Sequence, residues 1–422
     1  MKILHVNKFF PFAISQNAGN APSRPYPYGG TEHNMLVAMD VFKKHGHEVM
    51  AFSMKHPDGI RAEFNDYFVS YSDFDMDNFA QKMKLAGNIL YSLEAKKKLG
   101  QLLDDHPVDI VHLHNFHHQI SPSILSELRK RNIPTVMTLN DYKMVCPSYR
   151  LLNHGRICEL CKDGKFYNAA GTKCLKGSFV SSSIVALESY LHHGILNNYK
   201  DIKYYICASK FIMNKVQEMG LRGRFVNIPY PVDPARFEPY RREGKDIKNG
   251  IYWGRLSPEK GVDTLVDAVK TLPIDFKIIG DGPIRTRVEE HIKEGGINNI
   301  RMLSGMYGEK LLSEISKSAF LVVPSEWYEV SGIVIIEAFS LGMPVIGAKI
   351  GGIPELVKDG ETGFLFEPGN VDDLRGRIKE LISDPVRAFK MGKNGQAVAV
   401  KEHNPEIYYQ RLMEVYNNAI GS

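Results

Sequence analysis

Short apolar segments alternate with longer helix-like segments along most of this 422-residue chain. Such alternation predicts parallel β-sheets covered by helices, because the connection between two parallel strands is usually a helix. The predicted strands fall into two sets on either side of the proline-rich residues 228–234, which are expected to form a hinge. They are Lys2–Val6, Glu48–Ser53, Ile110–His114, Thr135–Leu139 and Tyr204–Ala208 in the first set, and Gly250–Trp253, Asp275–Ile279, Ile300–Leu303, Phe320–Val323, Pro344–Gly347 and Gly363–Phe366 in the second.

The two sets of strands predict two doubly wound α/β domains. A chain of 422 residues is too long for one typical core and suits two domains of roughly 200 residues. We expect the N-terminal domain to span residues 1–232 and the C-terminal domain to span residues 233–403. Ligands bind beyond the carboxyl ends of such strands, so the two domains should face a central cleft. Residues 404–422 are expected to form a final amphipathic helix.

Composition and charge limit the class of protein, its location and its possible partners. The hydrophobic content of 43% and the charged content of 24% are ordinary for a soluble folded protein. Lys2–Val6 is expected to be a strand rather than a secretory leader, and no apolar run reaches the roughly 18 residues that a spanning helix needs. We therefore expect a cytoplasmic protein. The net charge of +5 is compatible with an anionic acceptor or with peripheral contact at the inner membrane face.

Two cations lie near a predicted helix start after the strand that ends at Trp253. Ser257 and Pro258 are expected to be the N-cap and the first helical residue. Arg255 and Lys260 lie on either side of this start, although the positive end of a helix dipole disfavours cations. A bound anion, for example a phosphate group, resolves the conflict, and a solvated lysine is the alternative.

Two glutamates follow the predicted strand Phe320–Val323, at Glu329 and Glu337. Ser331 or Gly332 is expected to open the next helix. Eight helical residues span roughly 12 Å, about the distance from a sugar hydroxyl to the ribose of a nucleotide sugar. Carboxylates accept hydrogen bonds from vicinal hydroxyls, so the pair suits the two ends of such a molecule.

In order and spacing, these motifs resemble the retaining family 4 glycosyltransferases, which have the GT-B fold. This chain departs from the family at Val330-Ser331, where Pro or Gly followed by Phe is usual, and at Tyr230-Pro231, where Asn-Gly is usual. The resemblance implies transfer of a sugar from a UDP- or GDP-linked donor to an acceptor hydroxyl, without a catalytic metal. The matching residues are Gly254–Val262, Gly280–Pro283, Pro324–Ser325, Glu329, Glu337 and Gly351–Glu355.

The resemblance also implies roles for particular residues. Arg255 and Lys260 would stabilise the charge on the leaving diphosphate, which makes them catalytic residues together with Glu329 and His114. Glu329 would orient the donor sugar, and Glu337 would bind the ribose. The full set of implied donor-binding positions is Gly29, Gly30, Asp141, Gly254, Gly282, Ser331, Gly332, Ile333 and Glu337.

The N-terminal half contributes fewer signals. His112 and His114 lie on one face of a predicted strand, with His114 nearer the end at which ligands bind. A structural hydrogen-bonding role is the alternative, and it suits His112 better. Asp141 ends the next strand after Asn140, which replaces a histidine of the family, and it either binds the acceptor or caps a turn. The resemblance implies that residues 404–422 cross back to the first domain.

Four of the five cysteines lie close together in a basic insert expected at about residues 143–178. They are Cys146, Cys158, Cys161 and Cys174, arranged around a central Cys-x-x-Cys. In a cytosolic protein this spacing favours structural zinc held by four thiolates. An iron–sulfur cluster and unligated thiols are the alternatives. The insert has little hydrophobic periodicity, so a metal would supply its order.

Two other functions use parts of the same pattern. A GT-B-fold nucleotide-sugar epimerase or phosphorylase would share the cleft but perform different chemistry. A zinc-dependent nucleic-acid-binding protein would need only the basic insert, which offers few aromatic residues and no evident recognition helix. We therefore expect a nucleotide-sugar donor with a glycan, lipid-linked or small-molecule acceptor, and no nucleic acid partner.

Overall fold

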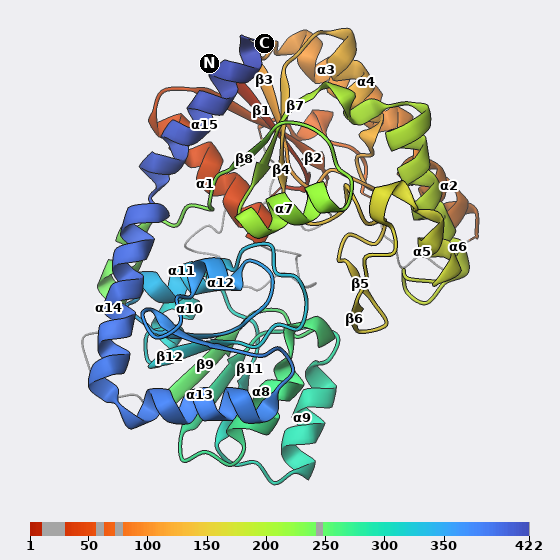
Figure 1. Cartoon of the computed structure of the whole chain (residues 1–422). Coiled ribbons are helices and arrows are strands. Elements are labelled where there is room, and N and C mark those ends of the chain that lie inside the picture. The colour runs from red at the N-terminus through yellow and green to blue at the C-terminus, as the bar shows by residue number, and fades with distance from the viewer. Residues whose placement is uncertain (11–29, 56–62, 72–78, 242–247, 422) are drawn as a thin grey trace.

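The computed structural model of this chain describes residues 1–10, 30–55, 63–71, 79–241 and 248–421. Two six-stranded parallel sheets with helices packed against them form two α/β domains, one above the other in Figure 1. The predicted fold class of two Rossmann-like domains is therefore confirmed. Within the described residues, no helix combines the length and the apolar character needed to cross a bilayer.

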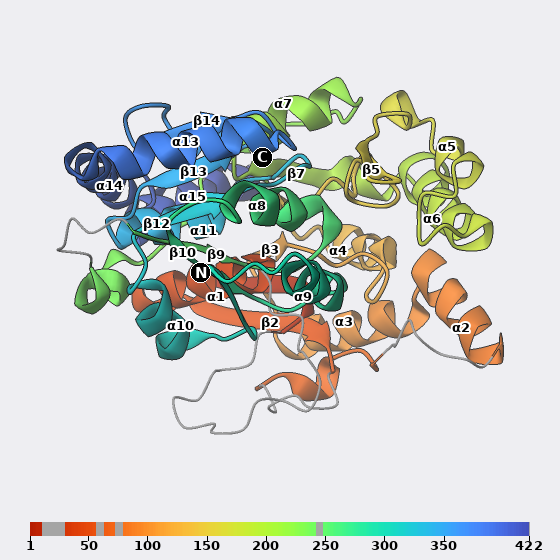
Figure 2. The same cartoon turned by 90° about the horizontal axis from the view of Figure 1, so that it is seen from below.

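The N-terminal sheet has the strand order β2-β1-β3-β4-β7-β8. Its strands are β1 (Lys2–Phe9), β2 (Glu48–Met54), β3 (Ile110–Leu113), β4 (Thr135–Leu139), β7 (Ile202–Cys207) and β8 (Phe225–Asn227). Its helices are α1 (Gly30–Lys44), α2 (Phe79–Leu90), α3 (Leu93–Asp105), α4 (Leu125–Lys130), α5 (Tyr167–Gly171), α6 (Phe179–Tyr190) and α7 (Lys210–Glu218). A short antiparallel pair, β5 (Leu152–Asn153) and β6 (Arg156–Ile157), lies with α5 and α6 to one side of this sheet in Figures 1 and 2.

The C-terminal sheet has the strand order β11-β10-β9-β12-β13-β14. Its strands are β9 (Asn249–Trp253), β10 (Asp275–Ile279), β11 (Ile300–Leu303), β12 (Phe320–Val323), β13 (Val345–Ala348) and β14 (Gly363–Phe366). The helices that follow or cover them are α8 (Val262–Val269), α9 (Arg285–Glu294), α10 (Gly308–Ile315), α11 (Ile333–Ser340), α12 (Ile353–Leu356) and α13 (Val371–Ser383).

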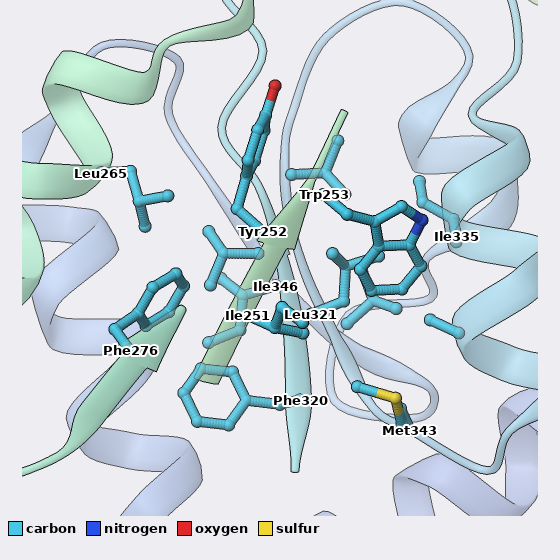
Figure 3. Packing of buried hydrophobic residues seen from close by; sticks show 14 of the residues in the cluster. Ile251, Tyr252, Trp253, Leu265, Phe276, Phe320, Leu321, Ile335, Met343 and Ile346 are labelled. Atoms are coloured by element: carbon cyan, nitrogen blue, oxygen red, sulfur yellow. The ribbon is translucent and has the colours of Figure 1, made fainter. Parts of the chain in front are cut away.

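Buried side chains fix β9 against its neighbours in the C-terminal domain, as Figure 3 shows. Ile251, Phe276 and Phe320 come from three adjacent strands and are almost fully buried. The ring centres of Phe276 and Phe320 are 6.3 Å apart. Full burial of such side chains stabilises a fold by about 1.5–3 kcal/mol each. The core therefore determines where β9 and β12 end, and the loops after these two strands start from fixed points.

The last two helices, α14 (Pro385–Glu402) and α15 (Pro405–Ile420), run along one side of both domains in Figure 1. Helix α14 packs against α11 in the C-terminal domain, and α15 packs against α1 in the N-terminal domain. Leu412 and Tyr416 of α15 are fully buried in a cluster that includes Phe42 of α1. The end of the chain therefore joins the two domains.

Every predicted strand is present, with small shifts at the ends. Strand β8 was not predicted, because only three partly exposed residues at the edge of the sheet form it. The carboxyl ends of the strands in the two sheets face each other. Tyr142 follows β4 and donates a hydrogen bond from its hydroxyl group to the carbonyl oxygen of Tyr328, which follows β12.

Candidate active site

The order of the C-terminal strands reverses between β9 and β12. In an open parallel sheet, a ligand binds beyond the carboxyl ends of the strands at such a reversal. Residues 254–261 follow β9, and residues 324–332 follow β12. These two segments therefore meet at the expected ligand position, and they contain most of the residues predicted to bind the donor.

The segment after β9 differs from its predicted form. Pro258–Lys260 is a single 3₁₀ turn, and α8 begins only at Val262. Gly261 between them has the left-handed conformation, with φ of 66°, and Ser257 makes no capping hydrogen bond. The predicted start after Ser257 is therefore present, but as one 3₁₀ turn and not as the first turn of a continuous α-helix. Lys260 lies in the turn that precedes the helix, because the backbone at Gly261 interrupts a continuous helical path.

Backbone contacts hold this turn against the loop after β10. The N–H group of Leu256 donates to the carbonyl oxygen of Asp281 at 2.9 Å, and that of Gly254 donates to Ile279 at 3.0 Å. A Cβ atom at Gly282 would lie 2.2 Å from the carbonyl oxygen of Leu256. Gly254 and Gly282 thus allow the loops after β9 and β10 to pack tightly against each other next to the site.

Replacing Gly261 with alanine should destabilise the turn that carries Lys260. The new Cβ atom would lie 1.9 Å from the carbonyl oxygen of Pro324, in a backbone conformation that alanine disfavours. We expect the free energy of unfolding, measured by urea denaturation, to fall by about 2–3 kcal/mol. Gly376→Ala is the matched control, because Gly376 lies in α13 with open space around it. The control should be at least as stable as the wild type, and equal losses in both variants would contradict this explanation.

Lys260 and Glu329 form an ion pair between the two segments. Lys260 Nζ lies 2.5 Å from Glu329 Oε1, and the hydroxyl group of Ser325 donates to the same oxygen at 2.7 Å. Lys260 Nζ also lies 5.2 Å from the ring centre of Trp327. Burial alone would raise the pKa of Glu329, but Lys260 and Ser325 outweigh burial and lower the pKa below its usual value. Glu329 is therefore ionised, and it holds Lys260 at the ligand end of the sheet.

Glu337 lies near the same place but is held differently. Its Oε2 accepts a hydrogen bond from Trp253 Nε1 at 3.1 Å. Helix α11 begins at Ile333, so Glu337 lies on the helix and Glu329 lies in the loop before it. The prediction that eight helical residues separate the two glutamates is therefore wrong. Burial raises the pKa of Glu337, although the hydrogen bond from Trp253 opposes this effect.

Two helix starts meet at the domain boundary. Helix α11 begins directly after Gly332, as predicted, and α1 begins at Gly30. A Cβ atom at Gly30 would lie 2.8 Å from the side chain of Ile333, so the two starts are in contact. Ser331 is buried beside them, and Gly29 lies outside the described residues. Helix N-termini attract anions, so an anionic group would be stabilised where both are close.

Of the other two predicted catalytic residues, Arg255 lies in the same segment after β9 as Lys260, and His114 follows β3 in the N-terminal domain. Arg255 is exposed, and the hydroxyl group of Tyr252 donates to its carbonyl oxygen at 2.8 Å. His114 is buried in the N-terminal domain, and its Nε2 lies 3.0 Å from Nδ1 of His5. The structure thus pairs Lys260 with Glu329, places Arg255 in the same loop as Lys260, and places His114 in the other domain.

His5, His112 and His114 form a buried cluster in the N-terminal sheet. Among the described residues, they are the only group of three or more potential metal ligands whose ligand atoms all lie within 4.8 Å of one another. His112 is committed to other partners, because its two ring nitrogens lie 2.7 Å from the hydroxyl groups of Tyr416 and Thr138. Burial lowers the pKa of all three histidines, so the rings are neutral. A structural role therefore suits His112.

Asp141 and Asn140 follow β4. The backbone N–H of Lys143 donates to Asp141 Oδ1 at 2.8 Å, so Asp141 caps a turn, and burial raises its pKa. The hydroxyl group of Tyr230 donates to Asn140 Oδ1 at 2.6 Å. Asn140 and Tyr230 both depart from the family pattern described above. The structure shows that these two departures are in direct contact.

The four predicted ligand cysteines line one small cavity. Cys146, Cys158, Cys161 and Cys174 surround a space of about 10 Å³, close to the size of one water-sized sphere. Burial and the neighbouring thiols raise the pKa of Cys161 to about 12. The sulfur atoms are spaced more widely than in a ligated site, since no three of them lie within 4.8 Å of one another. Four thiols around a cavity for a single ion nevertheless fit a tetrahedral sulfur site.

The side chains with which the N-terminal domain holds the segment around Glu329 were not predicted from the sequence. The hydroxyl group of Tyr142 donates to the carbonyl oxygen of Tyr328 at 3.0 Å, and that of Ser209 donates to the carbonyl oxygen of Val330. The carbonyl groups on both sides of Glu329 are thus bound by the other domain. The partners are 186 and 121 residues apart in sequence, so no local motif signals these contacts.

Two Rossmann-like domains with facing strand ends are the architecture of the GT-B class, and solved structures agree. Sucrose-phosphate synthase from Thermosynechococcus elongatus matches with a TM-score of 0.71 at 18% identity, over 100% of both chains. The Anabaena protein HepE, solved in complex with UDP and glucose, matches with a TM-score of 0.65 at 19% identity, over 99% of both chains. These likenesses show the fold.

The sequence comparisons point to glycosyltransferases. The family described as glycosyl transferases group 1 matches residues 240–398. An uncharacterized glycosyltransferase of Methanocaldococcus jannaschii is 29% identical over 331 residues, which are 78% of this chain and 81% of that protein. The sulfoquinovosyl transferase of Arabidopsis thaliana is 34% identical over 176 residues, 38% of this chain and 34% of that protein. Together with the fold, these matches support a GT-B glycosyltransferase and do not favour the alternative functions.

Proposed function

We propose that this protein is a retaining family 4 glycosyltransferase that transfers a sugar from a UDP- or GDP-linked donor to an acceptor hydroxyl. The acceptor is a glycan, a lipid-linked sugar or a small molecule, as in polysaccharide, glycolipid or other glycoconjugate synthesis. The observation that carries the proposal is the Lys260–Glu329 ion pair at the reversal between β9 and β12. The complex of HepE with UDP and glucose supports the class of donor.

In this proposal, Lys260 and Arg255 stabilise the negative charge that grows on the leaving diphosphate. A cation that is held in place before the reaction stabilises the transition state without reorganisation. The starts of α1 and α11 add the partial positive charges of two helix dipoles. The positive charge at the diphosphate then comes from the protein itself rather than from a catalytic metal.

Other residues bind the two ends of the donor. Glu329 orients the sugar, and Glu337 accepts hydrogen bonds from the ribose hydroxyls. His114 contributes its Nδ1 atom, which is buried and has no hydrogen-bond partner among the described residues. Such an atom costs about 1–3 kcal/mol, which a sugar hydroxyl would offset by hydrogen bonding to it. Asp141 belongs to the N-terminal side of the site, where the acceptor enters.

Glu337→Gln tests the ribose contact. Near pH 7, the variant should bind the donor about tenfold more weakly, because an amide is a poorer acceptor than a carboxylate. Donor affinity of the wild type should also fall as the pH decreases toward the raised pKa of Glu337, since protonation removes the same charge. The variant should lack this dependence. Calorimetric titration between about pH 8 and pH 5 measures both effects.

The control for this titration is Glu309→Gln, because Glu309 is exposed on α10. Its donor affinity should match that of the wild type at every pH. A Glu337→Gln variant with unchanged affinity and unchanged pH dependence would remove Glu337 from the donor site.

We also infer that the four cysteines bind structural zinc. Four thiols around one cavity, two of them in a Cys-x-x-Cys, suit the tetrahedral geometry of zinc. Exposed lysines at positions 162, 165, 173 and 176 make the surface of this module positive. Such a surface suits an anionic acceptor, or the anionic lipid headgroups that a cytoplasmic protein meets at the inner face of the membrane.

A further inference from the structure

We propose that Glu159, between Cys158 and Cys161, is a positioning residue for the donor site in the other domain. It acts through Tyr328, which directly precedes Glu329. The identity of the ligand rests on the proposed function, whereas the contacts between Glu159 and Tyr328 belong to the free protein.

The N-terminal domain holds the side chain of Tyr328 at several points. The phenolic O–H donates to Glu159 Oε1 at 3.0 Å. Lys215 Nζ lies 2.9 Å from the same oxygen and 5.2 Å from the ring centre of Tyr328. The ring of Phe211 packs against Tyr328 with 5.0 Å between the ring centres. The hydroxyl group and the ring of Tyr328 are therefore both fixed by residues outside the donor-binding domain.

The backbone around Glu329 is held by the same domain. Tyr142 and Ser209 donate hydrogen bonds to the carbonyl oxygens of Tyr328 and Val330. The side chain of Val330 is buried in the core of the N-terminal domain. Glu329 thus lies between two residues that the N-terminal domain binds, and the position of its carboxylate depends on those contacts. Because Glu329 pairs with Lys260, the cation depends on them as well.

The cysteine module supplies the acidic partner in this arrangement. Glu159 is the first residue after Cys158 and lies two positions before Cys161, and both cysteines line the proposed metal cavity. A metal held by these cysteines would restrain the backbone on both sides of Glu159. This restraint would direct the Glu159 carboxylate toward Tyr328. The module therefore supports the donor site from across the domain boundary, although none of its cysteines touches the donor.

Glu218, the second acidic partner of Lys215, provides a matched control for the experiment. It pairs with Glu159 at 2.9 Å and also with Glu218 at 2.8 Å. Glu218 is more exposed than Glu159. The hydroxyl group of Tyr328 donates to Glu159 and not to Glu218. Replacing Glu218 with glutamine therefore removes an equal charge from the same lysine while the Glu159–Tyr328 hydrogen bond is kept.

The proposal is tested first on the protein without ligand, by hydrogen–deuterium exchange of the amides at residues 325–333. Tyr328→Phe removes the Glu159–Tyr328 hydrogen bond and should speed the exchange by about fivefold to tenfold, whereas Glu159→Gln keeps only a weaker, neutral hydrogen bond and should speed it less. The double variant should exchange no faster than Tyr328→Phe alone, since that variant already lacks the bond. Glu218→Gln should exchange like the wild type. Unchanged exchange in both single variants would overturn the proposal.

Donor binding separates this proposal from the proposed function. With UDP- and GDP-sugars as probes, Tyr328→Phe should raise the dissociation constant about fivefold to tenfold while metal content and melting temperature stay unchanged. Unchanged affinity in Tyr328→Phe would overturn the positioning role. A wild type that binds no nucleotide sugar would refute the proposed function, and the exchange experiment would still decide whether Glu159 positions the segment.

Discussion

Lys260→Ala should reduce sugar transfer by about 100- to 1,000-fold, the largest effect expected from a single substitution in this protein. The substitution removes the cation that the proposed mechanism places at the leaving diphosphate. It also leaves the buried carboxylate of Glu329 without its ionic partner. We therefore expect the free energy of unfolding to fall by about 2 kcal/mol as well. Initial rates with saturating donor, together with urea denaturation, measure the two effects separately.

Lys270→Ala is the control for this substitution. Lys270 belongs to the same domain and pairs with Asp267 at 2.7 Å, but Lys270 is exposed and Asp267 is only partly buried. Exposed pairs contribute little, so the control should keep its transfer rate and change the free energy of unfolding by less than about 0.5 kcal/mol. If folded Lys260→Ala transferred sugar within threefold of the wild-type rate, Lys260 would not act on the donor.

Cys161→Ser should abolish metal binding and destabilise the protein strongly. We expect about one zinc ion per wild-type chain, because the four thiols surround a single cavity, and almost none in the variant. The part of the chain around the cavity has only a small apolar cluster of its own, formed by Cys161, Phe166, Ala169 and Ala186. Loss of the metal should therefore lower the melting temperature by about 10 °C. Elemental mass spectrometry and thermal unfolding give the two readings.

The fifth cysteine provides the control for the metal experiment. Cys207 is fully buried in β7 and does not line the cavity. Cys207→Ala should lower the free energy of unfolding by about 1–2 kcal/mol and keep its full metal content. Iron and sulfide in place of zinc would assign the cavity to a cluster. Wild-type protein without any metal would contradict a metal role for the four cysteines.

The sheets could be predicted from the sequence because their central strands are buried on both faces. Such strands are short apolar runs, for example Phe320–Val323, and each is bounded by residues that end a strand. The boundaries of the helices were harder to predict. The left-handed backbone at Gly261 delays α8 until Val262, whereas α11 begins directly after Gly332, as expected. A glycine in a motif does not by itself reveal which backbone conformation it adopts.

The candidate site was only partly predictable, because some of its contacts join residues that are far apart in the sequence. Lys260 and Glu329 each belong to a local motif, so the sequence identified both, and the structure adds that they form an ion pair. Glu159 lies within the Cys-x-x-Cys, which indicates a metal but not a contact with Tyr328, and the two residues meet across 169 residues only after both domains have folded. The burial of His114 was likewise not evident, because it depends on packing against His5 in another strand.

The most direct test of a nucleotide-sugar glycosyltransferase is thermal stabilisation of the wild type across UDP-, GDP- and ADP-sugars, with Lys260→Ala measured in parallel. The native donor, at about 100 times its dissociation constant, should raise the free energy of unfolding by about 2.7 kcal/mol. The proposal predicts one such donor, with the stabilisation lost in Lys260→Ala. If no nucleotide sugar stabilised the well-folded wild type, that result would contradict the proposed function.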